Sequence, residues 1–175
     1  MRFLTMSILT SVVFATAALT PTSANAQKGY VASIAGVWTG RGIIRKSSNA
    51  PKEAVRCRLK MVSKKNGGAF YVRYFCLGID IKFETTGTLS FNQKTKAIAG
   101  KLVTVGVGAF RAQGKLKGKN VSLTLSGKDK KTGKPVKGSL KIRQSSKTKL
   151  SSSLSATDVK TGKRFQAFKA SFKKQ

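Results

Sequence analysis

Histidine is absent from the 175-residue sequence, and acidic residues are scarce, with 5 Asp and Glu against 35 Lys and Arg. The absence of histidine excludes Ser-His dyads and triads, imidazole proton shuttles and most zinc or haem sites. The closest pair of acids, Asp80 and Glu84, would lie about 13 Å apart on a strand, which is too far for the paired carboxylates of a glycosidase. We therefore expect no enzymatic activity, no metal and no cofactor, although a mechanism based on Lys or Ser is left open.

Long apolar runs are also lacking, apart from Phe3–Leu19 near the start of the chain. This run follows a positively charged start and is followed by Ala24-Asn25-Ala26, small residues of the kind that a signal peptidase cuts after. An uncleaved membrane anchor is the weaker alternative, because the run is short for a span of about 20 residues. We expect a signal peptide over residues 1–26, a single mature domain over residues 27–175, and a periplasmic or secreted protein.

The predicted mature domain keeps a very large positive charge. Removal of residues 1–26 takes away Arg2 and no acid, so that 34 basic residues remain against 5 acidic ones over 149 residues. These basic residues are spread along the whole domain, and no separate basic tail exists. Such a domain binds polyanions without sequence specificity. After export, we expect its partners to be anionic lipid, lipopolysaccharide or glycan surfaces, with nucleic acid bound only nonspecifically and with peripheral association at the membrane.

Cysteine is limited to Cys57 and Cys76. Between them lies Lys64-Lys65-Asn66-Gly67-Gly68, and Asn-Gly is a strong signal for a tight β-hairpin turn. Folding the chain about this turn places the two cysteines directly opposite each other, on the core face of the hairpin. A four-residue loop over residues 65–68 would make the cysteines a non-hydrogen-bonded pair of the ladder, and a two-residue loop would make them a hydrogen-bonded pair. We expect a disulfide rather than a redox-active pair, because no Cys-x-x-Cys is present.

The remainder of the mature domain alternates apolar and polar residues with the period of a β-strand. Turns rich in Gly, Asn, Asp and Lys separate the alternating segments, and no helical period of comparable length is found. The predicted strands cover residues 36–46, 53–63, 69–77, 79–91, 96–104, 107–117, 119–127, 136–144, 148–156 and 164–172. This pattern predicts an all-β fold, an antiparallel meander that forms a small β-barrel or a curved half-barrel.

Two similar hexapeptides, Asp129–Lys134 and Asp158–Lys163, resemble a phosphate-binding loop at first sight because both contain Thr-Gly-Lys. The strand, loop and helix context that a phosphate loop needs is missing. A hairpin turn used twice explains the repeat better.

Gly36-Val37-Trp38 resembles the Gly-x-Trp opening strand of calycin barrels, the lipocalin-like group, in which the Trp plugs the barrel floor. With Thr39-Gly40-Arg41-Gly42, Glu53-Ala54-Val55-Arg56-Cys57 and a second cysteine, the chain is similar to a family of small uncharacterised exported alphaproteobacterial proteins. The resemblance covers residues 34–76 and implies a barrel-like fold with no established activity. Without it, Trp38 is most simply a core anchor.

The outer face of the predicted cysteine hairpin is the candidate ligand-binding site. By alternation, it carries Arg56, Arg58, Lys60, Tyr71, Arg73 and Phe75. Cations interleaved with aromatic rings suit a phosphate or sulfate on an aromatic or sugar body. A tight turn at Leu77-Gly78 would place Arg73 opposite Lys82 and diagonal to Asp80 and Glu84, so a solvated face of salt bridges is the alternative.

Two functions are therefore in contention. The first is a basic, non-enzymatic binding module for polyanionic partners of the cell envelope or a host surface. The alternative is a calycin-like carrier of a small apolar ligand; an inhibitor of a protease or lysozyme has no distinguishing loop here. A lumen lined by small residues such as Gly40, Gly42 and Gly100 would leave room for a ligand, whereas one filled by Phe70, Phe110, Phe168 and Phe172 would not.

Overall fold

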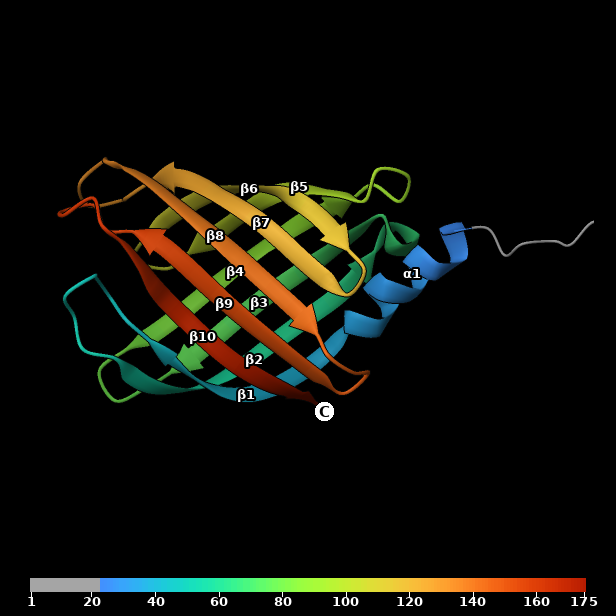
Figure 1. Cartoon of the computed structure of the whole chain (residues 1–175), viewed down its shortest axis with the longest axis horizontal. Coiled ribbons are helices and arrows are strands. Elements are labelled where there is room, and N and C mark those ends of the chain that lie inside the picture. Colours follow the sequence, from blue (N-terminus) through green and yellow to red (C-terminus); the bar gives the residue numbers. More distant parts are fainter. Residues whose placement is uncertain (1–22) are drawn as a thin grey trace, which may run out of the picture.

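Ten antiparallel strands form a closed barrel in the computed structural model, which describes residues 23–175 (Figure 1). The strands are β1 (Gly36–Ile44), β2 (Glu53–Lys64), β3 (Ala69–Leu77), β4 (Lys82–Phe91), β5 (Ala97–Thr104), β6 (Gly108–Lys117), β7 (Asn120–Lys128), β8 (Pro135–Gln144), β9 (Lys149–Thr157) and β10 (Arg164–Lys174). Each strand pairs with its neighbours in the sequence, and β1 also pairs with β10 to close the barrel. The predicted all-β meander is confirmed, as a closed barrel rather than a half-barrel.

A helix, α1 (Ser23–Ile34), precedes β1 and covers one end of the barrel (Figure 1). Its residues Tyr30, Val31 and Ile34 are buried in the core. The sequence does not predict this helix, because its buried residues, Tyr30, Val31 and Ile34, span little more than one turn, which is too short to establish a helical period. Residues 1–22 of the predicted signal peptide lie outside the described residues. No helix in the described part of the chain is long and apolar enough to span a membrane.

The β2–β3 hairpin has the predicted register. Cys57 pairs with Cys76, their Cα atoms are 4.1 Å apart, and a disulfide joins them. The connection is the short 3-10 turn η1 (Lys65–Gly67) followed by Gly68, and Lys65 and Asn66 have positive φ angles of 51°. This is the four-residue loop that makes the cysteines a non-hydrogen-bonded pair. The disulfide indicates a non-reducing compartment.

The β3–β4 turn differs from the predicted tight turn at Leu77-Gly78. Four residues, 78–81, form the turn, and the Gly78 N–H donates to the Ile81 carbonyl at 2.9 Å. Arg73 is consequently opposite Thr86 instead of Lys82. The shift is an even number of residues, so the inward and outward faces of β4 keep the expected alternation. The longer turn is stabilised because Glu53 Oε1 accepts the Asp80 N–H at 2.9 Å, a contact that involves a distant part of the sequence.

Candidate ligand-binding cavity and basic outer face

The barrel encloses a cavity of about 690 Å³. Its lining comes from α1 and all ten strands and is dominated by apolar side chains, among them Ile34, Met61, Phe70, Val72, Leu89, Leu102, Phe110, Leu123, Leu125, Ile142 and Phe168. Because side chains alternate along a strand, every second residue of the meander points into this space. The sequence predicts this inward apolar set, but it does not give the volume that the side chains leave unfilled.

One end of the cavity is closed by α1 and the start of β1; we call it the closed end. Trp38 is fully buried there, and its indole N–H donates to the Ile34 carbonyl at 2.9 Å. The ammonium group of Lys174 lies 5.3 Å from the centre of the Trp38 ring and donates to the Ser33 carbonyl at 2.9 Å. The Ser33 hydroxyl reaches Gln144 on β8 at 2.9 Å. These contacts fix α1 as a floor and place Trp38 in the position that calycin barrels imply.

The other end, which we call the mouth, is surrounded by the loops that follow the odd-numbered strands. Residues from all five of these loops line the cavity. Asp158 joins two of them: its Oδ2 accepts the Ser48 N–H and the Ser48 hydroxyl, both at 2.8 Å, and its Oδ1 accepts the Lys160 N–H at 2.9 Å. The hydrogen bonds from the backbone and hydroxyl of Ser48 and from the Lys160 backbone lower the pKa of Asp158 below its usual range. The mouth is therefore held by a carboxylate that is ionised at neutral pH.

The two repeated hexapeptides are hairpin turns at the mouth, as expected. In each, the Asp N–H donates to the carbonyl of the last Lys at 2.9 Å, and a Gly with positive φ, Gly133 or Gly162, allows the reversal. Asp129 Oδ1 accepts the Thr132 N–H at 2.7 Å and the Lys131 N–H at 3.1 Å, so its pKa is lowered by the same kind of hydrogen bond. Neither loop leads into a helix, and neither is a phosphate loop.

A few polar groups face the apolar interior. Tyr74 lines the cavity, and its buried hydroxyl, like that of the neighbouring Ser152 on β9, has no hydrogen-bond partner within bonding distance among the described residues. Burial raises the pKa of Tyr74, so the hydroxyl stays protonated. The hydroxyl groups of Thr85 and Thr104 are hydrogen-bonded to each other, with their oxygens 2.8 Å apart. An unpaired buried hydroxyl is costly, and it is a group that a ligand acceptor or donor could satisfy.

The lumen is neither lined by the glycines nor filled by the phenylalanines, the two arrangements that the sequence left open. Phe70, Phe110 and Phe168 line the cavity without filling it, and Phe172 packs edge-on against Tyr74 with ring centres 5.7 Å apart. Gly40 gives the Phe172 ring its space, because a Cβ at this position would meet that ring and the Ser171 carbonyl. The glycines thus serve packing between neighbouring strands, and the cavity exists beside the aromatic residues.

A bulge in β10 also shapes the lumen. The pairing with β9 shifts between Gln166 and Phe168. Phe165, Ala167 and Phe168 all line the cavity, which strict alternation would not allow. The sequence does not predict this bulge, because its only trace there is the adjacent apolar pair Ala167-Phe168, which does not mark an extra residue.

The predicted site residues share the outer face of the β2–β3 hairpin. Arg58 pairs with Phe75, Lys60 with Arg73, and Val62 with Tyr71, while Arg56 pairs with Leu77. Arg56, Arg58, Lys60 and Arg73 are exposed, and Tyr71 and Phe75 are half-buried. The structure thus brings the six residues to one face, and their role as a ligand site stays a prediction.

Some of these groups have partners within the protein. The Arg73 guanidinium forms an ion pair with Glu84 at 2.9 Å, the only ion pair between side chains in the described chain. The ammonium group of Lys82 lies 5.8 Å from the Phe75 ring centre, and that of Lys64 lies 5.8 Å from the Tyr71 ring centre. Within residues 23–175, Arg56, Arg58 and Lys60 have no acidic partner. Arg41, which pairs with Arg56 across β1 and β2, extends this cationic face and was missed because the β1–β2 register had not been predicted.

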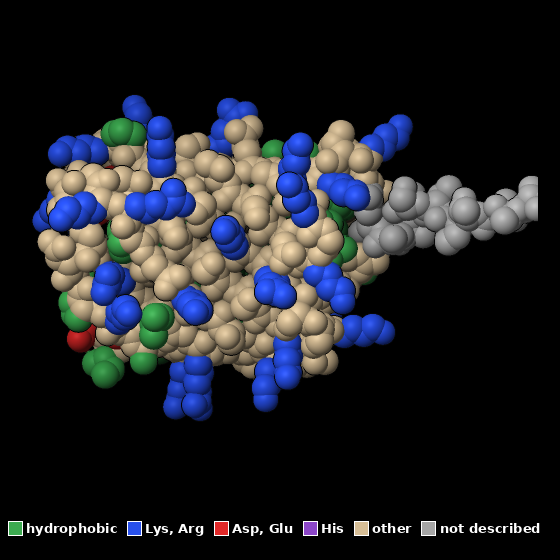
Figure 2. All heavy atoms as spheres, viewed as in Figure 1, with side chains coloured by type: hydrophobic (Ala, Val, Ile, Leu, Met, Phe, Trp, Pro, Cys, Tyr) green, Lys and Arg blue, Asp and Glu red, His purple; other side chains and the backbone are tan. Residues whose placement is uncertain are grey.

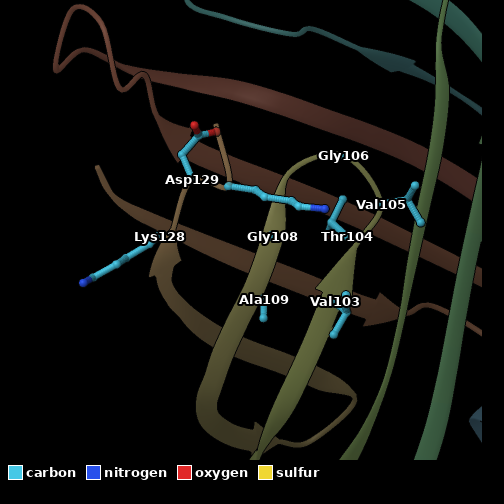
Figure 3. A pocket seen from close by; sticks show the side chains of 9 residues that line it. Val103, Thr104, Val105, Gly106, Gly108, Ala109, Lys128 and Asp129 are labelled. Carbon is cyan, nitrogen blue, oxygen red and sulfur yellow. The ribbon is translucent and has the colours of Figure 1, made fainter. Parts of the chain in front are cut away.

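A second, open depression of about 650 Å³ lies at the rim of the mouth, between the β5–β6 hairpin and the β7–β8 turn (Figure 3). Val103 and Val105 are exposed beside it. The Lys130 N–H donates to the Val107 carbonyl at 2.7 Å and fixes the two loops to each other. This depression shares Thr104, Val105 and Asp129 with the lining of the main cavity, so it is an extension of the mouth.

The fold is similar to that of solved proteins. The crystal structure of Rv2717c from M. tuberculosis matches with a TM-score of 0.65 and 16% sequence identity, over 89% of this chain and 98% of that chain. The S-type phycobiliprotein lyase CPES from Guillardia theta matches with a TM-score of 0.53 and 10% identity, also over 89% of this chain and 98% of that chain. No protein-family model and no curated protein sequence matches the chain. At these identities the similarity establishes the architecture alone: a closed antiparallel barrel.

Proposed function

We propose that the protein is a non-enzymatic carrier that binds a small apolar molecule inside its barrel. The observation that carries this proposal is the apolar cavity of about 690 Å³, closed at one end by α1 and reached through the mouth loops. Ligand sites in proteins have volumes of about 300 to 1,000 Å³ and combine an apolar lining with a few polar groups. The unpaired hydroxyl of Tyr74 supplies such a polar group.

The experiment is to identify what the protein carries when it is purified from its own host. Organic extraction followed by mass spectrometry should yield one class of apolar compound in a fixed ratio to protein. Ala156→Trp is the matched variant, because Ala156 lines the cavity on β9 and a Trp there would occupy the space near the mouth. The compound should be missing from this variant. An extract that is the same with and without the Trp would contradict the proposal.

We further propose that the protein is exported to the cell envelope or beyond. Support comes from the disulfide, which persists outside reducing compartments, and from the leader-like residues 1–26. Cleavage after Ala26 would leave in place Tyr30, Val31 and Ile34, the helix residues buried in the core. Mass measurement of the protein recovered from the periplasm or the medium should show a chain that begins at Gln27; a chain that retains residue 1 would contradict this.

A second candidate function is polyanion binding at the hairpin face. It is supported by Arg56, Arg58 and Lys60, which are exposed and have no acidic partner. Because the paired strands hold these cations at fixed spacing, they lose less entropy on binding than lysines in turns. Reversing Arg56 and Arg58 to Glu should lower the salt concentration needed for elution from heparin more than reversing Lys130 and Lys134. Both variants change the net charge by the same amount, so equal shifts would mean that only total charge matters.

A further inference from the structure

The closed end of the barrel carries a ring of lysines. Each of the four hairpin turns at this end has two exposed lysines in it or directly beside it. They are Lys64 and Lys65 between β2 and β3, Lys94 and Lys96 between β4 and β5, Lys117 and Lys119 between β6 and β7, and Lys147 and Lys149 between β8 and β9. We call these eight residues the lysine crown.

All acidic residues of the chain lie toward the opposite end. Asp80, Asp129 and Asp158 are in mouth loops, Glu53 is the first residue of β2, and Glu84 is the third residue of β4. Figure 2 agrees with this arrangement: on the visible face, Lys and Arg cover the whole length of the barrel, whereas acidic side chains are seen only at the end away from the grey N-terminal residues. The molecule is therefore basic over its whole surface, and the few acids that offset this charge all lie toward the mouth.

The acids at the mouth have structural partners. Asp129 and Asp158 accept the N–H groups of their turns, Glu53 accepts the Asp80 N–H, and Glu84 pairs with Arg73. At the closed end neutral side chains take this role: Asn92 Oδ1 accepts the N–H groups of Lys94 and Thr95, both at 3.0 Å, and Ser146 Oγ accepts the Thr148 N–H at 3.2 Å. Like charges at these turns repel one another and oppose compaction, so a crown of eight lysines without acids costs stability unless a partner neutralises it.

The closed end is also the end at which the chain enters the barrel. α1 begins outside the barrel and runs toward its floor (Figure 1). The mature chain proposed above begins at Gln27, within α1, and therefore starts at the end that carries the lysine crown.

We propose that the lysine crown docks the protein on an anionic lipid bilayer, with the mouth directed away from it. Clusters of lysines near a membrane surface gain affinity from each charge through attraction to anionic headgroups. A ring of flexible ammonium groups around one end of a barrel suits a broad planar surface. Single-stranded nucleic acid fits less well, because it needs aromatic platforms for its bases, and the exposed large apolar residues in the described chain are all aliphatic.

The test uses the protein as recovered from its host, with matched variants at the two ends. The double variant Lys117→Glu/Lys119→Glu reverses the charge of one turn of the crown. The double variant Lys130→Glu/Lys134→Glu reverses the charge of one turn at the mouth. All four lysines are exposed. Sedimentation with phosphatidylglycerol-containing vesicles should show a loss of affinity of about tenfold or more for the crown variant and a much smaller loss for the mouth variant. Vesicles of phosphatidylcholine alone should bind neither variant nor the parent protein.

Circular dichroism confirms that both variants fold, and the same proteins are then run on heparin. Equal losses on vesicles, or a larger loss for the mouth variant, would overturn the proposal. It would also be overturned if the crown variant lost heparin affinity while keeping vesicle affinity, because the crown would then serve a soluble polyanion. The docking test is independent of the cavity, since a protein that carries no apolar ligand could still dock through the crown.

Discussion

Asp158 and Asp129 occupy the same position in two nearly identical turns, yet they differ in what they hold together. Asp129 binds only its own turn, whereas Asp158 also accepts two hydrogen bonds from Ser48 on the β1–β2 loop. The repeat in the sequence predicts the turns, because the Asp, Thr and Gly positions are local. It does not predict the contact with Ser48, because that depends on how two distant loops meet at the mouth.

Replacement of Asp158 by Ala should destabilise the protein in a pH-dependent way. The folded state holds the pKa of Asp158 below its unfolded value. The hydrogen bonds to the carboxylate therefore stabilise the fold fully above about pH 4, and this stabilisation is lost as the pH falls through the folded pKa. Urea unfolding at pH 7 should therefore show the parent to be more stable than Asp158→Ala. The difference should shrink steadily below about pH 4. A difference that is equal at pH 7 and pH 2 would show that the ionised carboxylate is not the cause.

At the scale of elements, hairpins were predictable where the turn carries its own signal. Asn66-Gly67 determined the β2–β3 register and hence the cystine and the outer face. The β3–β4 turn carries only Gly78, and its true length depends on Glu53 from another strand. Helix α1 was likewise not predictable from its own residues, because its short apolar stripe is stabilised by contact with the barrel floor, where Trp38 donates a hydrogen bond to the Ile34 carbonyl. Local chemistry thus predicted most strand boundaries, while contacts between distant segments decided the exceptions.

The Cys57–Cys76 disulfide should stabilise the hairpin chiefly by restricting the unfolded chain. Because it links residues 19 apart, replacement of both cysteines by Ala should lower the free energy of unfolding by roughly 3 kcal/mol. Denaturant unfolding of the oxidised parent and the double variant measures this difference. The barrel should keep its circular dichroism spectrum, because the β2–β3 hydrogen bonds do not depend on the sulfurs. A difference near zero would mean that the unfolded hairpin is already compact without the bond.

At the scale of the whole molecule, the two ends of the barrel have different chemistry. The closed end combines α1, Trp38 and the lysine crown, and the mouth combines the cavity opening with every acid of the chain. The sequence indicated the high charge and the inward apolar set. It did not indicate that acids and lysine pairs separate along the barrel axis, because their separation follows from the alternation of hairpin ends in a closed meander.

The central claim, an accessible apolar lumen, is tested most directly by titration with N-phenyl-1-naphthylamine, a neutral apolar fluorophore. The parent protein should enhance its fluorescence in a saturable manner with one site per chain. Ala156→Trp, which faces the cavity, should weaken binding by at least about tenfold, while Ser151→Trp, exposed on the outer wall of the same strand, should leave it unchanged. No saturable binding to the parent, or equal binding by both Trp variants, would contradict the account.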